Sequence, residues 1–221
     1  MILFQYLPAL ASGLLTTVLL ALAALVLGGS LACLMTLLSL SKYLSLKVPV
    51  EIFIFCIRGT PLLVQIFLIY FGLGQFELIR ASPVWVILQE PFACALIALA
   101  LNTSAYTTVL LKGAIASVPK TEVIACEALG MSYALAMRRI IFPRAVGIVL
   151  PAYSNEVVIV LKGTSLVSTI TILDLMGATN QIIAQTYDTL PFLCLAGAIY
   201  LALNITIMRV FHYVERRWGV A

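Results

Sequence analysis

Long stretches without a charged residue constrain the fold of this chain more than any other feature. No charged side chain precedes Lys42, and the later runs 59–76, 91–111 and 189–208 also carry none. Apolar stretches of about 18 or more residues can span the hydrocarbon core of a bilayer. Only 10% of the 221 residues are charged and 63% are hydrophobic, whereas about 25% of the residues in a soluble domain are charged. The sequence therefore predicts an integral membrane protein.

The apolar runs predict five transmembrane helices in one domain covering residues 1–221. Only helices and closed barrels satisfy backbone N–H and C=O groups in lipid. These runs lack the alternating pattern of barrel strands, so we expect an all-α integral membrane fold. The predicted spans are about 10–40, 50–74, 91–113, 144–161 and 190–211.

Lysine and arginine residues predict the orientation, because they concentrate on the cytoplasmic side of membrane proteins. They follow the first span, surround the link between the third and fourth spans, and flank the end of the fifth. The residues are Lys42, Lys47, Lys112, Lys120, Arg138, Arg139, Arg144, Arg209, Arg216 and Arg217. Five crossings place all three regions on one side. We therefore expect a periplasmic N-terminus and a cytoplasmic C-terminus.

The segment 117–143 is too polar for a span and too regular for an open loop. Its apolar residues have helical spacing. Gly130 can end a helix by adopting a positive φ or can admit another backbone, and Pro143 would begin or kink the next helix. We predict two short helices at an angle against the inner face of the membrane. They could cap the bundle as an interfacial helix, or form a knob that a cytoplasmic partner grips.

This segment resembles the cytoplasmic coupling loop of ABC importer permeases, with its pattern E-A-A, three residues, G, nine residues, I-x-L-P. The matching positions are Ile124, Ala125, Cys126, Gly130 and the run 140–143, which ends at Pro143. Ile124 stands where the family usually has glutamate, Cys126 replaces alanine and Phe142 replaces leucine. The resemblance implies that the region around Gly130 docks onto an ATPase.

Three further stretches, 58–72, 100–115 and 153–177, are similar to permeases of the polar-amino-acid (histidine, arginine and glutamine) family. The last is closest to the arginine-importer permeases, of which the chain most resembles the one usually called subunit M. The resemblance implies a type I ABC importer permease fold in the bacterial inner (cytoplasmic) membrane. It also implies a cytoplasmic ATPase dimer that uses ATP and Mg, a second permease subunit (homologous or identical), and an external amino-acid-binding protein.

Ionisable side chains in the spans are candidates for the substrate pathway, since each costs about 2.5–3.5 kcal/mol to insert. We predict that Glu156 balances the charge of a cationic amino acid. Arg58 could instead form a structural ion pair with Glu156 or contact backbone carbonyls. Asp174 raises the same question in the segment that follows. The candidate pathway residues are Arg58, Asn102, Asn155, Glu156, Lys162, Thr164 and Ser165.

The roles of the polar candidates are open between two interpretations. Asn102 and Thr103 could line the pathway or serve as hydrogen-bonding contacts between helices. Tyr106 could stack on a substrate guanidinium or simply pack. Lys162, with Thr164 and Ser165, could donate to the substrate carboxylate.

Several other functions find no support in the sequence. There is no G-x-x-x-x-G-K-[ST] motif, so we expect no bound cofactor and ATP on a separate chain. The glycine-rich stretch 26–32 is better explained as a packing notch. The lone His212 has no second ligand nearby, which predicts no metal site, and no basic–aromatic patch indicates nucleic acid. A stand-alone secondary transporter and an intramembrane enzyme, which would need catalytic residues at membrane depth, remain as alternatives.

Overall fold

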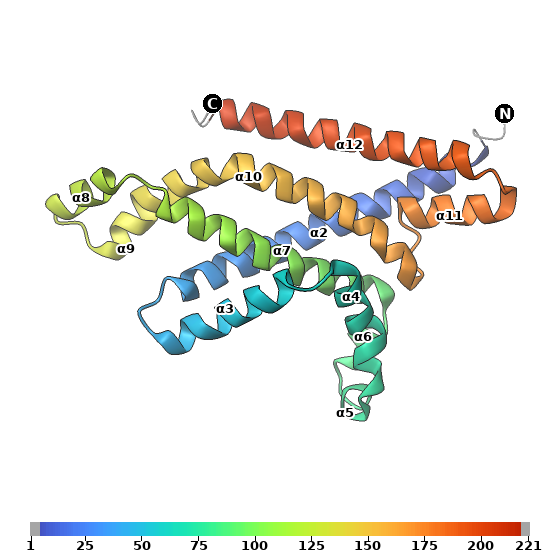
Figure 1. The fold of residues 1–221 in the computed structure, drawn as a ribbon, viewed down its shortest axis with the longest axis horizontal. Coiled ribbons are helices and arrows are strands. Elements are labelled where there is room, and N and C mark those ends of the chain that lie inside the picture. Colours follow the sequence, from blue (N-terminus) through green and yellow to red (C-terminus); the bar gives the residue numbers. More distant parts are fainter. Residues whose placement is uncertain (1–4, 218–221) are drawn as a thin grey trace.

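The computed structural model describes residues 5–217, and all the regular secondary structure in that range is helical (Figure 1). Residues 1–4 and 218–221 of the predicted domain lie outside this part. The helices long and apolar enough to cross a bilayer are α2 (Leu7–Ser39), α7 (Pro91–Ala116), the stretch Tyr133–Ile170 with α10 (Phe142–Gly163), and α12 (Thr189–Arg217). A bent helix pair would make a fifth crossing. The prediction of an all-helical membrane fold is confirmed.

The second predicted span, 50–74, is not one helix. It is divided between α3 (Leu44–Arg58) and α4 (Leu62–Phe67), and the chain bends by 106° at the break. Pro61 has no N–H to donate to a helical hydrogen bond, and it disfavours the helical conformation at Thr60. The proline therefore ends the first helix and starts the next in a new direction.

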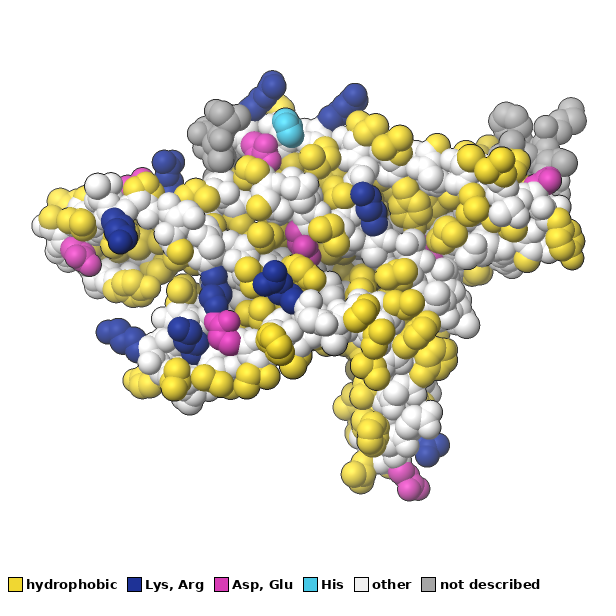
Figure 2. Space-filling view, in the orientation of Figure 1, with side chains coloured by type: hydrophobic (Ala, Val, Ile, Leu, Met, Phe, Trp, Pro, Cys, Tyr) yellow, Lys and Arg dark blue, Asp and Glu magenta, His cyan; other side chains and the backbone are white. Residues whose placement is uncertain are grey.

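An arm of short helices leaves the bundle at this break (Figure 1). It contains α4, a π-helical turn (Leu68–Gly72), a 3-10 turn (Leu73–Gln75), α5 (Glu77–Arg80) and α6 (Trp85–Leu88). Figure 2 shows hydrophobic side chains along the arm and charged ones at its tip. Leu78, in α5, is 89% exposed. The arm thus presents an apolar surface outside the bundle.

Short helical elements link the long helices at both ends of the bundle. The elements α8 (Lys120–Ala128) and α9 (Tyr133–Ala136) join α7 to α10, while a 3-10 helix (Thr164–Ile170) and α11 (Leu175–Thr186) join α10 to α12. Figure 1 places α8, α9, the α2–α3 turn and the last turn of α12 at one end, and the start of α2 at the other. Most Lys and Arg side chains visible in Figure 2 lie toward the α8 end.

Helix α7 occupies the centre of the bundle. It packs against α2, α3, α4 and α10, and 61% of its most apolar stretch is buried, compared with 11% for α12. Its contact with α2 is closest at Gly28. A Cβ atom on Gly28 would lie 2.2 Å from Thr103 Cγ2 and 2.7 Å from the Ala100 carbonyl oxygen. Within the glycine-rich stretch, Gly28 is therefore a packing notch, as small residues commonly are between membrane helices.

Asp174 caps a helix at the end of the bundle opposite α8. Its Oδ1 accepts a hydrogen bond from the Gly177 N–H at 2.9 Å, and its Oδ2 accepts from the Met176 N–H and from Tyr200 Oη, both at 3.3 Å. The residue is fully buried. Burial raises the pKa of the Asp174 carboxyl, and the Gly177 and Met176 N–H groups offset part of that rise. A role as the cap of α11 therefore explains why an ionisable residue, Asp174, stands in this otherwise uncharged segment.

Replacing Gly28 tests the α2–α7 contact. Gly28→Ala should lower the free energy of unfolding by about 1–3 kcal/mol, because the added Cβ overpacks the interface. Thermal unfolding in detergent, followed by intrinsic fluorescence, measures the change. The matched control is Gly29→Ala, whose Cβ would meet only Tyr153 Oη at 3.8 Å and which should leave stability unchanged or slightly raised. Equal effects at both positions would contradict this account.

Replacing Asp174 tests the cap of α11. Asp174→Ala should destabilise the protein by about 1–2 kcal/mol, because the first N–H groups of the helix lose their acceptor. Asp174→Asn should retain most of that stability, since asparagine is an equally good cap. Both melting temperatures can be measured in the same detergent. If the asparagine substitution cost as much stability as the alanine substitution, then charge, and not the cap, would matter here.

Candidate functional site

The segment between α7 and α10 forms two helices joined by a tight turn at Gly130. The Gly130 N–H donates to the Glu127 carbonyl at 2.9 Å, and the Met131 N–H donates to the Cys126 carbonyl at 3.0 Å. This pair of bonds is a Schellman motif, which needs a residue with positive φ, and Gly130 has φ +68°. A Cβ there would meet no atom of the described chain within 4 Å. Of the two predicted reasons for a glycine, positive φ is the correct one.

The second helix of this segment runs directly into α10. The Ser132 hydroxyl accepts a hydrogen bond from the Leu135 N–H at 3.4 Å and so caps α9. A π-helical turn, Met137–Ile141, then joins α9 to α10. Pro143 lies in the first turn of α10, so the helix passes through the proline without a break. Movement of α9 would therefore be passed to α10.

The motif residues of this segment divide into a buried anchor and an exposed face. Cys126 is 2% exposed and packs in an apolar cluster with residues of α7, α9 and α10, including Leu111 and Val149. Ile124 and Leu129 are 60% and 78% exposed, and Ala125 is also exposed. The segment is thus fixed to the bundle on one side and presents apolar side chains on the other.

A salt bridge ties α8 to the start of α10. Glu122 Oε1 lies 3.5 Å from Arg144 Nε. The carboxylate of Glu122 therefore contacts its own chain.

Glu156 lies in the middle of α10 and faces α7. It is 4% exposed, and its Oε1 accepts a hydrogen bond from Thr103 Oγ1 at 2.8 Å. Within residues 5–217 no cation pairs with it; the ion pairs found are Lys112–Glu51, Arg144–Glu122 and His212–Glu215. A buried carboxylate without a counter-charge is costly. Such a group inside a membrane span is most often functional.

The ion pair between Arg58 and Glu156, one of the two structural alternatives for Arg58, does not form. Arg58 is the last residue of α3, and its guanidinium carbon lies 5.2 Å from the centre of the Tyr106 ring. The guanidinium is held there by a cation–π contact and by the negative end of the α3 dipole. Tyr106, which was considered as a surface for a substrate guanidinium, therefore stacks on the chain's own arginine.

Asn102 holds the break in the second span to α7. Its Nδ2 donates to Gln65 Oε1 at 3.0 Å, and Gln65 Nε2 donates to the carbonyls of Ile57 and Thr60 at 2.7 and 3.0 Å. The Ile57 carbonyl belongs to the last turn of α3, where carbonyls lack partners within the helix, and the Thr60 carbonyl lies in the break itself. The sequence analysis did not single out Gln65, although a glutamine among apolar residues just after Gly-Thr-Pro was the available signal. Asn102 thus acts as a contact between helices.

The remaining pathway candidates do not gather around Glu156. Asn155 and Lys162 are exposed on α10. The Thr164 and Ser165 hydroxyls donate to the carbonyls of Leu161 and Lys162, both at 2.7 Å. The hydrogen atoms of both hydroxyls are therefore already used within their own helical segment.

An ion pair between α3 and α7 was also missed. Lys112 Nζ contacts Glu51 Oε1 directly. Each residue looked like an isolated charge near the end of a predicted span, and only their contact in the fold identifies them as a pair.

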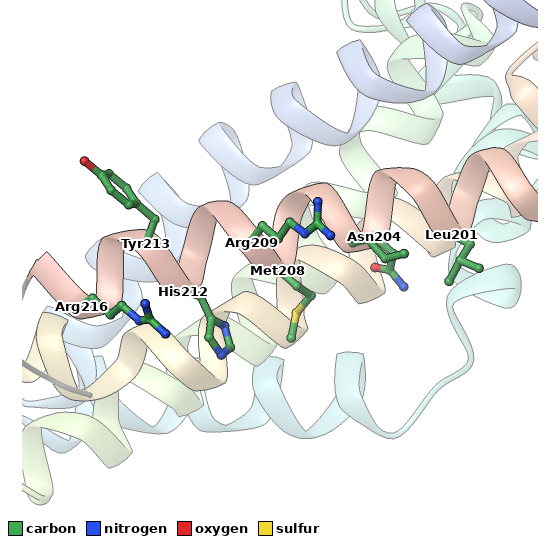
Figure 3. Close-up of a pocket in the computed structure, with 8 residues that line it drawn as sticks. Leu201, Asn204, Met208, Arg209, His212, Tyr213 and Arg216 are labelled. Atoms are coloured by element: carbon green, nitrogen blue, oxygen red, sulfur yellow. The ribbon is translucent and has the colours of Figure 1, made fainter.

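A hollow of about 530 Å³ lies on α12 (Figure 3). Its lining includes Leu201, Met208, Arg209 and Arg216, and every lining residue belongs to this one helix. It is therefore a groove on the outer face of α12 and not a passage between helices. His212 also lines this groove, and its Nδ1 lies 3.9 Å from Glu215 Oε2.

Comparison with known proteins identifies the family. Residues 31–220 match the family described as binding-protein-dependent transport system inner membrane component. The octopine transport system permease protein OccM of Rhizobium radiobacter is 43% identical over 213 residues, which cover 96% of this chain and 87% of that protein. The arginine ABC transporter permease protein ArtM of Escherichia coli K12 is 43% identical over 220 residues, covering 97% and 96%. The nopaline transport system permease protein NocM of Agrobacterium fabrum is 42% identical over 209 residues, covering 94% and 87%.

Solved structures agree with this assignment. The crystal structure of an amino acid ABC transporter with histidines superposes with a TM-score of 0.88 at 33% identity, covering 97% of this chain and 96% of that one. The inward-facing MetNI methionine ABC transporter has the same fold, with a TM-score of 0.72 at 14% identity over 98% and 96% of the two chains.

These matches favour one of the predicted functions over the others. The alternatives of a stand-alone secondary transporter and of an intramembrane enzyme are therefore dropped. The chain belongs to the family of binding-protein-dependent transport system inner membrane components, as a multi-pass, non-catalytic permease subunit of an ABC importer for amino acids.

Proposed function

We propose that this chain is the permease subunit of an ATP-driven importer for a basic amino acid, with arginine as the substrate. The relatives named above are transporters of arginine, octopine and nopaline, and these three compounds share a guanidinium group. The observation that carries the proposal in the structure is Glu156. It places a buried carboxylate inside a span, where a cation in transit needs an anionic partner.

The geometry of Glu156 suits this role. A cation that leaves water for a site of low dielectric constant requires an anionic partner with good hydrogen bonds. Thr103 occupies Oε1 of Glu156, and in the part of the chain that the structure describes no hydrogen bond reaches Oε2. A substrate guanidinium or ammonium would donate to this free oxygen. Arg58, Asn155 and Lys162 remain candidates for contacts elsewhere on the pathway.

The exposed face of the 117–143 segment serves as the docking knob for the ATPase. Ile124 and Leu129 are apolar yet exposed, and they are held in place by the buried Cys126. Because α8 follows α7 and α9 continues into α10, a pull on the knob would move α7 and α10 relative to each other. Thr103 and Glu156 lie on these two helices. The knob and the substrate charge are thereby mechanically connected.

The complete importer requires partners that this chain does not supply. We expect a cytoplasmic ATPase dimer that binds ATP and Mg, a second permease that is either a homologous subunit or another copy of this chain, and an external binding protein. The end of the bundle that carries α8 and most basic side chains would face the cytoplasm, because Lys and Arg favour that side.

Glu156→Gln tests the substrate charge. The exchange keeps size and hydrogen-bonding capacity but removes the negative charge, so we expect arginine to bind at least about tenfold more weakly, in line with a charge-assisted hydrogen bond. Binding can be measured by titrating arginine into the purified permease–ATPase complex. Citrulline, a neutral analogue of the same shape, is the control ligand and should bind both proteins similarly. Unchanged arginine affinity in a fully assembled complex would refute this role.

Leu129→Glu tests the docking knob. A carboxylate on the exposed face should block ATPase contact without unfolding the chain, since Leu129 makes little contact within it. We expect co-purification of the ATPase to fall more than about tenfold, as for loss of a central apolar contact in an interface. Tyr43→Glu, at the same end of the bundle and 72% exposed, is the matched control and should retain the ATPase. Normal recruitment by Leu129→Glu protein would favour an interfacial cap instead.

A further inference from the structure

Thr103 differs from its hydroxyl-bearing neighbours in where it sends its hydrogen bond. Serine and threonine inside helices usually donate back to a carbonyl one turn earlier. Ser104 and Thr108 on the same helix do so, donating to the carbonyls of Leu101 and Ser104 at 2.7 and 2.6 Å. Thr103 instead donates across the helix interface to Glu156. Its hydroxyl is directed away from its own helix.

The α2 helix accounts for this direction. The Thr103 methyl group fills the notch at Gly28. A Cβ atom on Gly28 would collide with it at 2.2 Å. The methyl and hydroxyl groups share one β-carbon, and a β-branched side chain has few χ1 rotamers. Seating the methyl group against Gly28 therefore fixes where the hydroxyl points. Thr103 is 1% exposed, so it has no alternative partner in water.

We propose that Thr103 is a positioning residue that holds the Glu156 carboxylate ready for a cationic substrate. This inference rests on the proposed role of Glu156 as the counter-charge. The hydroxyl satisfies Oε1 and fixes the plane of the carboxylate. Oε2 is then the one oxygen left to accept from a guanidinium or ammonium group.

The role predicts a specific loss when the hydroxyl is removed. In Thr103→Val protein the shape stays nearly the same, but the carboxylate loses the one hydrogen-bond donor that residues 5–217 provide for it. Arginine affinity should fall roughly tenfold or more, as expected for a hydrogen bond to a charged group. Citrulline affinity should change less than about threefold, because a neutral ligand gains little from the oriented charge.

Two further variants separate positioning from packing. Thr103→Ser keeps the hydroxyl and should restore arginine affinity to within about threefold of the starting protein, the remaining cost reflecting the lost methyl group. Thr107→Val is the matched control: Thr107 lies one turn further along α7, is 4% exposed, and its Oγ1 has no hydrogen-bond partner in the described chain. This substitution should leave the affinity for arginine unchanged.

The experiment is a titration of arginine and of citrulline into each purified permease–ATPase complex, with assembly checked by size-exclusion chromatography. Weakened arginine binding in Thr103→Val protein alone, rescued by serine, supports the inference. Equal losses in the Thr107→Val protein, no rescue by serine, or unchanged arginine affinity in the Thr103→Val protein would overturn it. If the valine variant does not assemble, Thr103→Cys replaces it and is compared with Thr103→Ser, because a thiol is a poor donor of similar size.

The same titrations distinguish this inference from the function on which it rests. If Glu156→Gln weakens arginine binding and Thr103→Val does not, Thr103 has no positioning role while Glu156 keeps its role as counter-charge. If neither substitution affects arginine binding, the counter-charge proposal fails and the inference fails with it.

Discussion

The close approach of α2 and α7 at Gly28 is the contact on which the rest of the bundle depends. Membrane helices gain no hydrophobic driving force from packing together in lipid, so they rely on close contact between small residues and on hydrogen bonds. Gly28 provides the first, because it brings the backbone of α2 against Ala100 and Thr103. This contact buries the centre of α7 and removes water from its polar residues. Their hydrogen bonds must then be made to other helices.

Helix α7 makes these bonds in several directions. Asn102 reaches Gln65 at the break between α3 and α4, Thr103 reaches Glu156 on α10, and Lys112 reaches Glu51 on α3. Helix α7 thus holds three parts of the fold: the broken second span, Glu156 on α10, and the part of α3 that carries Glu51. A buried central helix with partners on three neighbours can transmit a displacement among them. The outer helix α12, which is exposed along most of its length, has no comparable set of contacts in residues 5–217.

The sequence predicted those parts of the fold that depend on local chemistry. Uncharged apolar runs indicated the spans, and the position of Gly130 indicated a helix end, because each follows from a residue and its near neighbours. The sequence predicted a single span over 50–74, whereas the chain bends by 106° next to Pro61. Asn102, which contacts the break through Gln65, lies 37 residues from that glutamine. The sequence also did not predict the hydrogen-bond partner of Glu156. Arg58 was one partner considered, whereas the fold supplies a hydroxyl 53 residues away.

The π-helical turn Met137–Ile141 has a consequence for how the segment 117–143 and the Glu156 carboxylate are aligned. Each residue advances an α-helix by about 100°, and a π turn contains one residue more than an α turn. The face of α10 that carries Glu156 is therefore rotated by about 100° from where an unbroken α-helix beginning at Ser132 would place it. The direction of the carboxylate around the helix axis is thus set at the start of the helix, next to the segment 117–143. The number of residues between Ser132 and Glu156 is therefore fixed, because one residue more or fewer would turn the carboxylate away from α7.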